Sequence, residues 1–150
     1  MRTPTELTEL FRTRGLKVTP QREAVIRALV GNDLHPTAEA VHAVVTAEMP
    51  SVSLRTVYQV LNDLAGMGEI HALELGTGAA RFDPNVDAHH HLVCTACGKV
   101  RDVYVEAVAL PAAAPGFTVD SAEVVFRGRC DDCRRSNHRC CRRNNDFGRR

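Results

Sequence analysis

Two cysteine pairs with the same internal spacing form the clearest chemical pattern in this 150-residue chain. They are Cys94 with Cys97 and Cys130 with Cys133. Thiolates two residues apart can reach one metal ion from a tight turn, and two such turns complete the tetrahedral shell of a closed zinc site. The 32 residues between the pairs exceed a usual zinc-ribbon loop, but loop-closure entropy grows only logarithmically with length. We therefore predict one structural Zn²⁺ site; two disulfides of an exported protein are the alternative.

A second group of potential ligands combines histidines with aspartates. His89 and His91 are two residues apart in a predicted strand, so both rings should project from one face. Asp83 lies at a predicted hinge, and His35 precedes a predicted helix. Together with Asp102 they would form a mixed nitrogen and oxygen site, which suits Fe²⁺, Mn²⁺ or another first-row divalent ion. The alternatives are solvated polar residues beside a turn, or a surface run of histidines.

The composition is that of a soluble globular protein, with 44% hydrophobic and 25% charged residues. No apolar run approaches the roughly 20 residues of a membrane helix, and the polar N-terminus does not resemble a secretory signal. We therefore expect a cytoplasmic protein with no membrane partner. Residues 134–150 hold seven of the 19 basic residues and one of the 18 acidic residues. Any nucleic-acid binding by the remainder must depend on a few placed cations.

Helical periodicity covers most of the N-terminal half. Four helices are predicted to begin near Thr5, Thr19, Thr37 and Ser53, and to end near Gly15, Gly31, Pro50 and Gly66. Two short strands, over residues 69–74 and 79–82, should then form a β-hairpin across a glycine-rich turn. Packed helices followed by a hairpin predict a winged helix.

The pattern changes after Asp83 to short strands over residues 91–94, 99–104 and 119–127, with a helix-like segment at 105–110. A unit of this size can bury only a small hydrophobic core. We therefore expect zinc to stabilise its fold and a second subunit to complete its core. The predicted fold class is α+β, an N-terminal winged helix-turn-helix domain followed by a small α+β dimerisation domain with a structural zinc site. The predicted divisions are a DNA-binding domain at 1–83, a hinge at 84–87, a dimerisation and zinc-binding domain at 88–133, and a basic, disordered tail at 134–150. Cys140 and Cys141 lie in that tail, and we interpret them as bystanders because adjacent cysteines do not easily share one tetrahedral site.

The helix beginning at Ser53 is the candidate DNA-reading element. A winged helix presents the N-terminal turns of this helix to the major groove. Its apolar residues recur at helical spacing and face the core, which leaves its polar residues available for DNA. Residues at the start of the second helix could bind the phosphate backbone. The predicted DNA contacts are Lys17, Thr19, Arg22, Arg55, Thr56, Tyr58 and Gln59; a solvated helix surface is the alternative.

Several short segments occur in a fixed order along the chain: LKVTPQR at 16–22, HPTA at 35–38, TVY at 56–58, RFD at 81–83, HHHLVC at 89–94 and the two cysteine turns. With these segments the chain resembles, over roughly residues 5–134, the ferric uptake regulator (Fur) family of metal-dependent repressors. The resemblance implies a homodimer, an N-terminal winged helix, a C-terminal dimerisation domain, and metal-activated binding to palindromic operators in double-stranded DNA.

Within that family the pattern is most similar to the peroxide-sensing branch, PerR. The resemblance implies a regulatory Fe²⁺ or Mn²⁺ bound by His35, Asp83, His89, His91 and Asp102. It also implies that Fe²⁺ and hydrogen peroxide oxidise His35 or His89, which releases the operator. An iron-responsive or zinc-responsive uptake repressor is the alternative. Ala88 and Ala122 occupy positions where many relatives carry histidines of a further metal site, so we expect that site to be missing.

An enzyme is the competing functional class. A histidine and carboxylate metal site can activate water, so a metal-dependent hydrolase is conceivable. The sequence contains no paired nucleophile and base and no phosphate-binding loop, and hydrolysis leaves a winged helix unexplained. We therefore predict a regulator with no small-molecule substrate other than metal ions and hydrogen peroxide.

Overall fold

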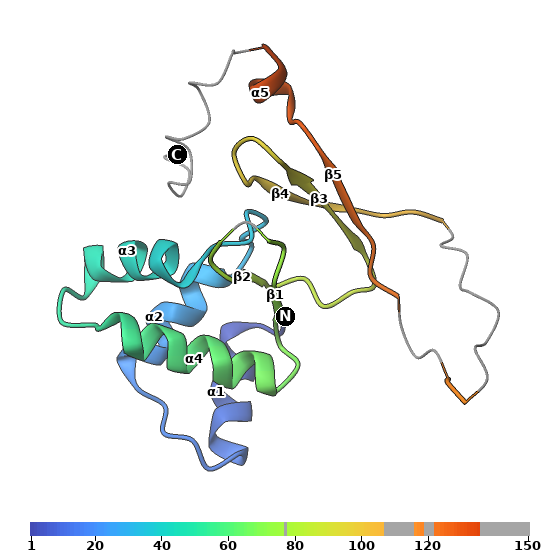
Figure 1. The fold of residues 1–150 in the computed structure, drawn as a ribbon. Coiled ribbons are helices and arrows are strands. Elements are labelled where there is room, and N and C mark those ends of the chain that lie inside the picture. The colour runs from blue at the N-terminus through green and yellow to red at the C-terminus, as the bar shows by residue number, and fades with distance from the viewer. Residues whose placement is uncertain (77, 107–115, 119–121, 136–150) are drawn as a thin grey trace.

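The computed structural model describes residues 1–76, 78–106, 116–118 and 122–135. Four helices come first in the chain, and the strands and a last short helix follow them (Figure 1). The helices are α1 (Pro4–Thr13), α2 (Pro20–Leu29), α3 (Ala38–Glu48), α4 (Leu54–Gly66) and α5 (Asp131–Arg135). The strands are β1 (His71–Leu73), β2 (Arg81–Asp83), β3 (His90–Cys94), β4 (Val100–Val103) and β5 (Val125–Gly128).

The first four helices confirm the predicted series, and each begins with a side-chain cap. Thr3, Thr19, Thr37 and Ser53 each accept a hydrogen bond from the backbone N–H three residues later. These caps satisfy N–H groups that a helix cannot pair internally. The helices pack around one apolar core, to which α4 contributes four fully buried side chains: Val57, Val60, Leu61 and Leu64.

Strands β1 and β2 form an antiparallel hairpin after α4, shorter than predicted. The first strand was expected from Glu69, but Glu69 is only 4% exposed and its carboxylate pairs with Arg2. A buried carboxylate needs such a partner, and regular pairing begins two residues later, at His71. The four helices and this hairpin have the predicted winged-helix arrangement (Figure 1).

The second sheet has the strand order β4-β3-β5. Strand β3 pairs antiparallel with β4 and parallel with β5, which brings distant segments of the chain together. The register places His91 opposite Asp102 and Cys94 opposite Gly128. Leu73 and Leu75, from the hairpin side, share a small core with Val93 of this sheet. The hairpin therefore packs on the sheet across the predicted hinge, and the division of the chain at residues 84–87 stays a prediction.

Other predictions meet the described residues only in part. The strand expected from residue 119 begins at Val125, and residues 119–121 lie outside the described part. Most of the helix expected at 105–110 also lies outside it, as do Cys140 and Cys141. Helix α5 was not predicted, and it extends over Arg134 and Arg135, the first two residues assigned to the tail. Among the described residues, no helix has the length and apolar character needed to cross a membrane.

Leu61→Ala should lower the free energy of unfolding by about 2–5 kcal/mol, because it leaves a cavity in a fully packed core. Asn62→Ala, on the exposed side of the same helix, is the matched control and should change stability by no more than about 0.5 kcal/mol. Urea unfolding followed by circular dichroism measures both variants. Equal effects would contradict the assigned core.

Candidate metal centres

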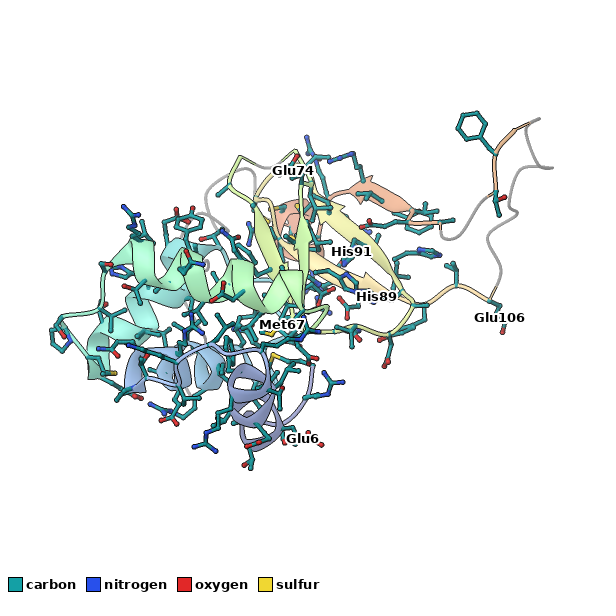
Figure 2. The ribbon with its side chains drawn as sticks, turned by 90° about the horizontal axis from the view of Figure 1, so that it is seen from below. Glu6, Met67, Glu74, His89, His91 and Glu106 are labelled. Carbon is teal, nitrogen blue, oxygen red and sulfur yellow. The ribbon has the colours of Figure 1, made fainter. Side chains whose placement is uncertain are left out.

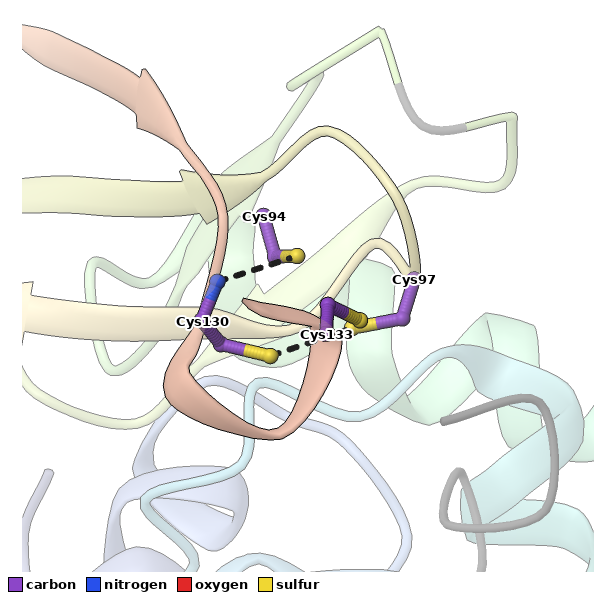
Figure 3. A group of neighbouring side chains, drawn as sticks. All are labelled: Cys94, Cys97, Cys130 and Cys133. Carbon is purple, nitrogen blue, oxygen red and sulfur yellow. Dashed lines mark hydrogen bonds between the residues drawn. The ribbon is translucent and has the colours of Figure 1, made fainter. Parts of the chain in front are cut away.

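The four predicted zinc ligands form one cluster (Figure 3). Cys94 ends β3, Cys97 follows in the adjoining turn, and Cys130 and Cys133 lie at the end of β5 and in α5. The four sulfur atoms lie within 4.8 Å of one another, and the Sγ atoms of Cys97 and Cys130 are 3.8 Å apart. Sulfurs around a tetrahedral Zn²⁺ would be separated by about 3.8 Å. The cluster therefore fits a structural zinc ion, with every position filled by sulfur.

The local backbone favours a thiolate at Cys94. Burial alone raises the pKa of this thiol, but hydrogen bonds from the backbone N–H groups of Cys130, Ala96 and Cys97 lower it to about 6. The N–H group of Cys130 lies 3.4 Å from Cys94 Sγ, which ties the two cysteine turns together. Because zinc binds thiolates and not thiols, this lowered pKa prepares the turn for the metal.

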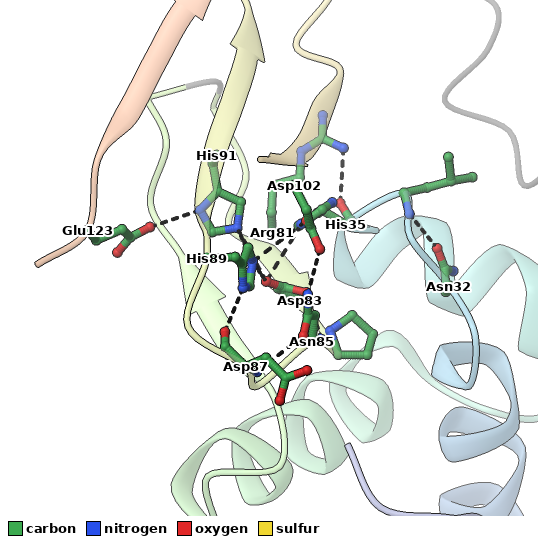
Figure 4. Close-up of polar contacts among 12 residues, drawn as sticks. Asn32, His35, Arg81, Asp83, Asn85, Asp87, His89, His91, Asp102 and Glu123 are labelled. Carbon is green, nitrogen blue, oxygen red and sulfur yellow. Dashed lines mark hydrogen bonds and ion pairs between the residues drawn. The ribbon is translucent and has the colours of Figure 1, made fainter. Parts of the chain in front are cut away.

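The second predicted ligand group also converges, at the junction of the helices and the sheet (Figures 2 and 4). His35 comes from the loop before α3, Asp83 ends β2, His89 precedes β3, His91 lies in β3, and Asp102 lies in β4. The four side chains other than Asp102 are at most 3% exposed, and Asp102 is 22% exposed. Segments far apart in the sequence thus bring three imidazoles and two carboxylates to one point.

The Nε2 atoms of the three histidines face the two carboxylates. His89 Nε2 lies 2.8 Å from Asp83 Oδ2, and His35 Nε2 lies 2.7 Å from Asp102 Oδ1. His91 Nε2 lies 3.3 Å from Asp83 Oδ2. Ligand atoms about 2.1 Å from a central divalent ion would lie about 3 Å apart at adjacent octahedral positions. The spacing therefore fits a single bound cation.

Orphaned polar atoms support the same interpretation. Within the described residues, His35 Nε2 and Asp102 Oδ1 are buried and have no partner with hydrogen-bond geometry, although they lie 2.7 Å apart. Buried polar atoms in proteins are normally satisfied. A divalent ion between them would satisfy both, and the mixed nitrogen and oxygen donors suit a first-row metal. The group fits a regulatory metal site.

Further residues hold the ligands from outside, and the sequence did not predict them. His91 Nδ1 lies 3.1 Å from Glu123 Oε1, and His89 Nδ1 lies 2.7 Å from the carbonyl oxygen of Asp87. Asn85 donates from its backbone N–H to Asp83 Oδ1 at 2.8 Å and from its side chain to Asp102 Oδ2 at 2.7 Å. Each partner occupies the atom that points away from the cluster centre, which leaves Nε2 or the other oxygen for a metal (Figure 4). Glu123 is 32 residues from His91, so no local sequence pattern could reveal it.

Charge interactions inside the cluster shift two pKa values in opposite directions. Burial opposes ionisation of Asp83, but interactions with His35, the backbone N–H of Asn85 and His91 outweigh it and lower the pKa of Asp83 to about 2. Burial also opposes a charged His35, yet the carboxylates of Asp83 and Asp102 raise the pKa of His35 above its usual range. The metal-free cluster thus favours positive charge beside its carboxylates, and a bound divalent ion supplies that charge.

The further metal site that many relatives carry, which we expect to be missing, would have Ala88 and Ala122 at its two histidine positions. Both alanines line a cavity of about 380 Å³ next to His89 and His91. Alanine offers no ligand atom. Among the residues that the structure describes, only the four cysteines and the five-residue group bring three or more potential ligand atoms together.

The predicted DNA-contacting residues lie along the start of α2, the loop before it and the first turns of α4. Lys17 and Arg55 are exposed, whereas Arg22 pairs with Asp63 at 2.6 Å and stacks over Phe11. Thr19 and Thr56 take part in the helix caps. The Tyr58 hydroxyl donates to Glu39, and Gln59 donates to Asp63. Arg22 thus has a packing role between α1, α2 and α4, and DNA contact by the seven residues remains a prediction.

Comparison with known proteins shows which family this chain belongs to. The model of the Ferric uptake regulator family matches residues 13–127. The Peroxide-responsive repressor PerR of Staphylococcus saprophyticus is 30% identical over 127 residues, covering 82% of this chain and 86% of that protein. The same-named repressor of Staphylococcus aureus strain USA300 is 31% identical over 127 residues, with the same shares covered. The structure of the Helicobacter pylori ferric uptake regulator Fur superposes with a TM-score of 0.73 at 22% identity, covering 90% of this chain and 96% of that one.

The two centres predict different variant phenotypes. Cys94→Ser should lose zinc and with it the folded, dimeric sheet, because a closed structural zinc site contributes folding free energy. Asp102→Ala should keep zinc and the dimer but weaken binding of a second divalent ion by more than about tenfold. Elemental analysis and size-exclusion chromatography on the same samples measure both properties. If the two variants behaved alike, the assignment of separate structural and regulatory roles would be wrong.

Proposed function

Because this chain belongs to the ferric uptake regulator family of metal-dependent transcriptional repressors, we propose that it is the peroxide-sensing kind. Members of this family regulate transcription and bind operator DNA as dimers, so the chain is a regulator and not an enzyme. The main support for peroxide sensing is the ligand set, which has aspartates at both carboxylate positions, together with 30–31% identity to peroxide-responsive repressors. The regulatory ion is proposed to be Fe²⁺ or Mn²⁺.

The proposed sensing step is oxidation of a ligand histidine. Fe²⁺, when bound, supplies the redox activation of hydrogen peroxide. One peroxide oxygen is inserted at the C2–H bond of the His35 or His89 imidazole, and the other leaves as water. The ring loses two electrons and becomes a 2-oxo-imidazole, while the peroxide gains them. Mn²⁺ bound by the same residues would activate repression without this chemistry.

Oxidation of either ring would separate the parts that the cluster joins. His35 and Asp83 come from the helices and hairpin, whereas His89, His91 and Asp102 come from the sheet and the segment leading into it. An oxidised imidazole is a poorer ligand, so the contact between these parts weakens and the spacing of the two DNA-reading helices in the dimer is lost. A full switch from 1:99 to 99:1 requires the metal to favour the closed form by about 5.5 kcal/mol.

The proposed DNA-reading surface is the N-terminal end of α4 with the loop before α2. Arg55 and Lys17 are the exposed cations there, and they are proposed to contact base edges and phosphates. Thr19, Thr56, Tyr58 and Gln59 surround them along the same two elements. Arg22 is proposed to act mainly by fixing α2 against α4, since Asp63 already pairs with it.

Operator binding should depend on the regulatory metal. In a gel-shift assay with a palindromic, AT-rich operator, Mn²⁺ should strengthen binding, and a chelator that spares the zinc should abolish it. Arg55→Ala should weaken binding by about 1–3 kcal/mol while leaving metal content unchanged. Arg27→Ala, an exposed arginine in the last turn of α2 and away from its start, is the charge-matched control. Binding that ignores Mn²⁺ would argue against metal-dependent repression.

Hydrogen peroxide should covalently modify the protein when Fe²⁺ is bound. Mass spectrometry of digested protein should find one added oxygen atom on the peptide of His35 or His89, with parallel loss of operator binding. The Mn²⁺ form should remain unmodified under the same treatment. His42 and His71, outside the cluster, serve as internal controls. An Fe²⁺ protein that leaves DNA without histidine oxidation, or tolerates peroxide, would instead indicate an iron-responsive repressor.

A further inference from the structure

Arg81 is a buried cation that neither the zinc cluster nor the regulatory cluster includes. It lies in β2, two residues before Asp83, and is only 7% exposed. Its Nη1 donates to the carbonyl oxygen of His35 at 3.2 Å, and its Nη2 donates to the carbonyl oxygen of Gly98 at 3.0 Å. Gly98 directly follows the zinc ligand Cys97. One guanidinium therefore bridges the backbones of both metal centres, and Figure 4 shows Arg81 beside His35.

The backbone that Arg81 holds on the regulatory side is unusual. His35 has a φ of 49° and is the one residue other than glycine with a positive φ in the described ranges. This left-handed conformation is disfavoured for a residue with a side chain, so the surrounding contacts must maintain it. Strand β2 holds two consecutive carbonyls here, because Phe82 N–H also donates to the Pro36 oxygen at 2.9 Å. These bonds fix the direction in which the His35 ring enters the cluster.

Electrostatics on the other side link Arg81 to zinc. Four thiolates around one Zn²⁺ carry a net charge of about −2. The bond from Arg81 Nη2 to the Gly98 carbonyl oxygen places the guanidinium one residue from the zinc ligand Cys97. A buried cation is costly without a compensating anion, so the filled zinc centre stabilises the guanidinium in its bridging position.

We propose that Arg81 is a positioning residue that couples the zinc centre to the regulatory metal site by holding the backbone of His35. The guanidinium fork suits this role because it reaches two carbonyl oxygens at once, whereas a lysine ammonium is a single point of charge. The inference rests on the proposed use of the five-residue cluster as a metal site, but not on peroxide chemistry.

The test compares Arg81→Lys and Arg81→Gln with Arg101→Gln in zinc-loaded protein. Arg101 is exposed on β4 next to Asp102, so its variant removes a positive charge near the regulatory site without touching the bridge. Isothermal titration with Mn²⁺ should show about 10- to 100-fold weaker binding for both Arg81 variants. Arg101→Gln should bind as the wild type does, and Arg81→Lys should keep its zinc and its thermal midpoint.

Hydrogen exchange separates coupling from simple loss of fold. In the wild type and in Arg101→Gln, Mn²⁺ should slow amide exchange in the zinc-turn peptide of residues 94–99. In Arg81→Lys, Mn²⁺ at saturating concentration should leave that exchange unchanged. Wild-type affinity or wild-type protection in Arg81→Lys would overturn the proposal, as would loss of zinc by both Arg81 variants, which would make Arg81 a purely structural residue. A wild-type protein that failed to bind Mn²⁺ would instead count against the proposed function.

Discussion

The structure depends on one electrostatic constraint, the placement of two aspartates and three histidines in a largely buried space. Asp83 and Asp102 both approach the same His35 nitrogen, and water cannot screen them well there. Two carboxylates in such a setting require positive charge between them. Protons on the histidines can supply part of it, but a divalent ion also satisfies atoms that otherwise lack partners. The approach of the helices to the sheet is therefore tied to whether a cation occupies this point.

The two metal centres divide their tasks according to ligand chemistry. The cysteine cluster offers four sulfur ligands from one protomer, and a structural zinc ion bound there would hold the end of β3 to the segment after β5. The other cluster offers nitrogen and oxygen ligands, and they come from the helical part, the hairpin and the second sheet, which the proposed switch would separate. If zinc stays bound at the cysteine cluster while the histidine–aspartate cluster loses its metal, the helices can move relative to the sheet while the sheet stays folded. Under the proposed function, regulation requires that the zinc site keeps its ion while the other site gains and loses metal.

Sequence reasoning succeeded where the physical cause is local. Helix caps and apolar periodicity predict the first four helices, and the cysteine spacing predicts the first ligand group. The second ligand group needed the family resemblance as well as the spacing of the histidines. The hairpin and the last strand were predicted too long, because strand ends depend on pairing and burial, as the buried Glu69 shows. The sequence did not reveal three residues that hold the ligands, which are Asn85, Asp87 and Glu123. Their contacts depend on strand register and on how distant segments come together in the fold, and a single sequence shows neither. Arg22 shows the opposite difficulty, since an arginine suited to phosphate also suits an ion pair with Asp63.

The aromatic residues of the chain have a practical consequence. It contains no tryptophan and only two tyrosines, so fluorescence excited at the tyrosine absorption band comes from those two rings. Tyr58 lies on α4 with its hydroxyl bonded to Glu39, while the Tyr104 hydroxyl lies 2.8 Å from the Asn85 side chain and its ring packs near His89. One intrinsic chromophore therefore lies on the helix assigned to DNA and the other beside the exchangeable metal. Tyrosine fluorescence of the unlabelled protein can therefore follow both DNA binding and metal binding. Replacing either tyrosine with phenylalanine would show which ring gives each signal.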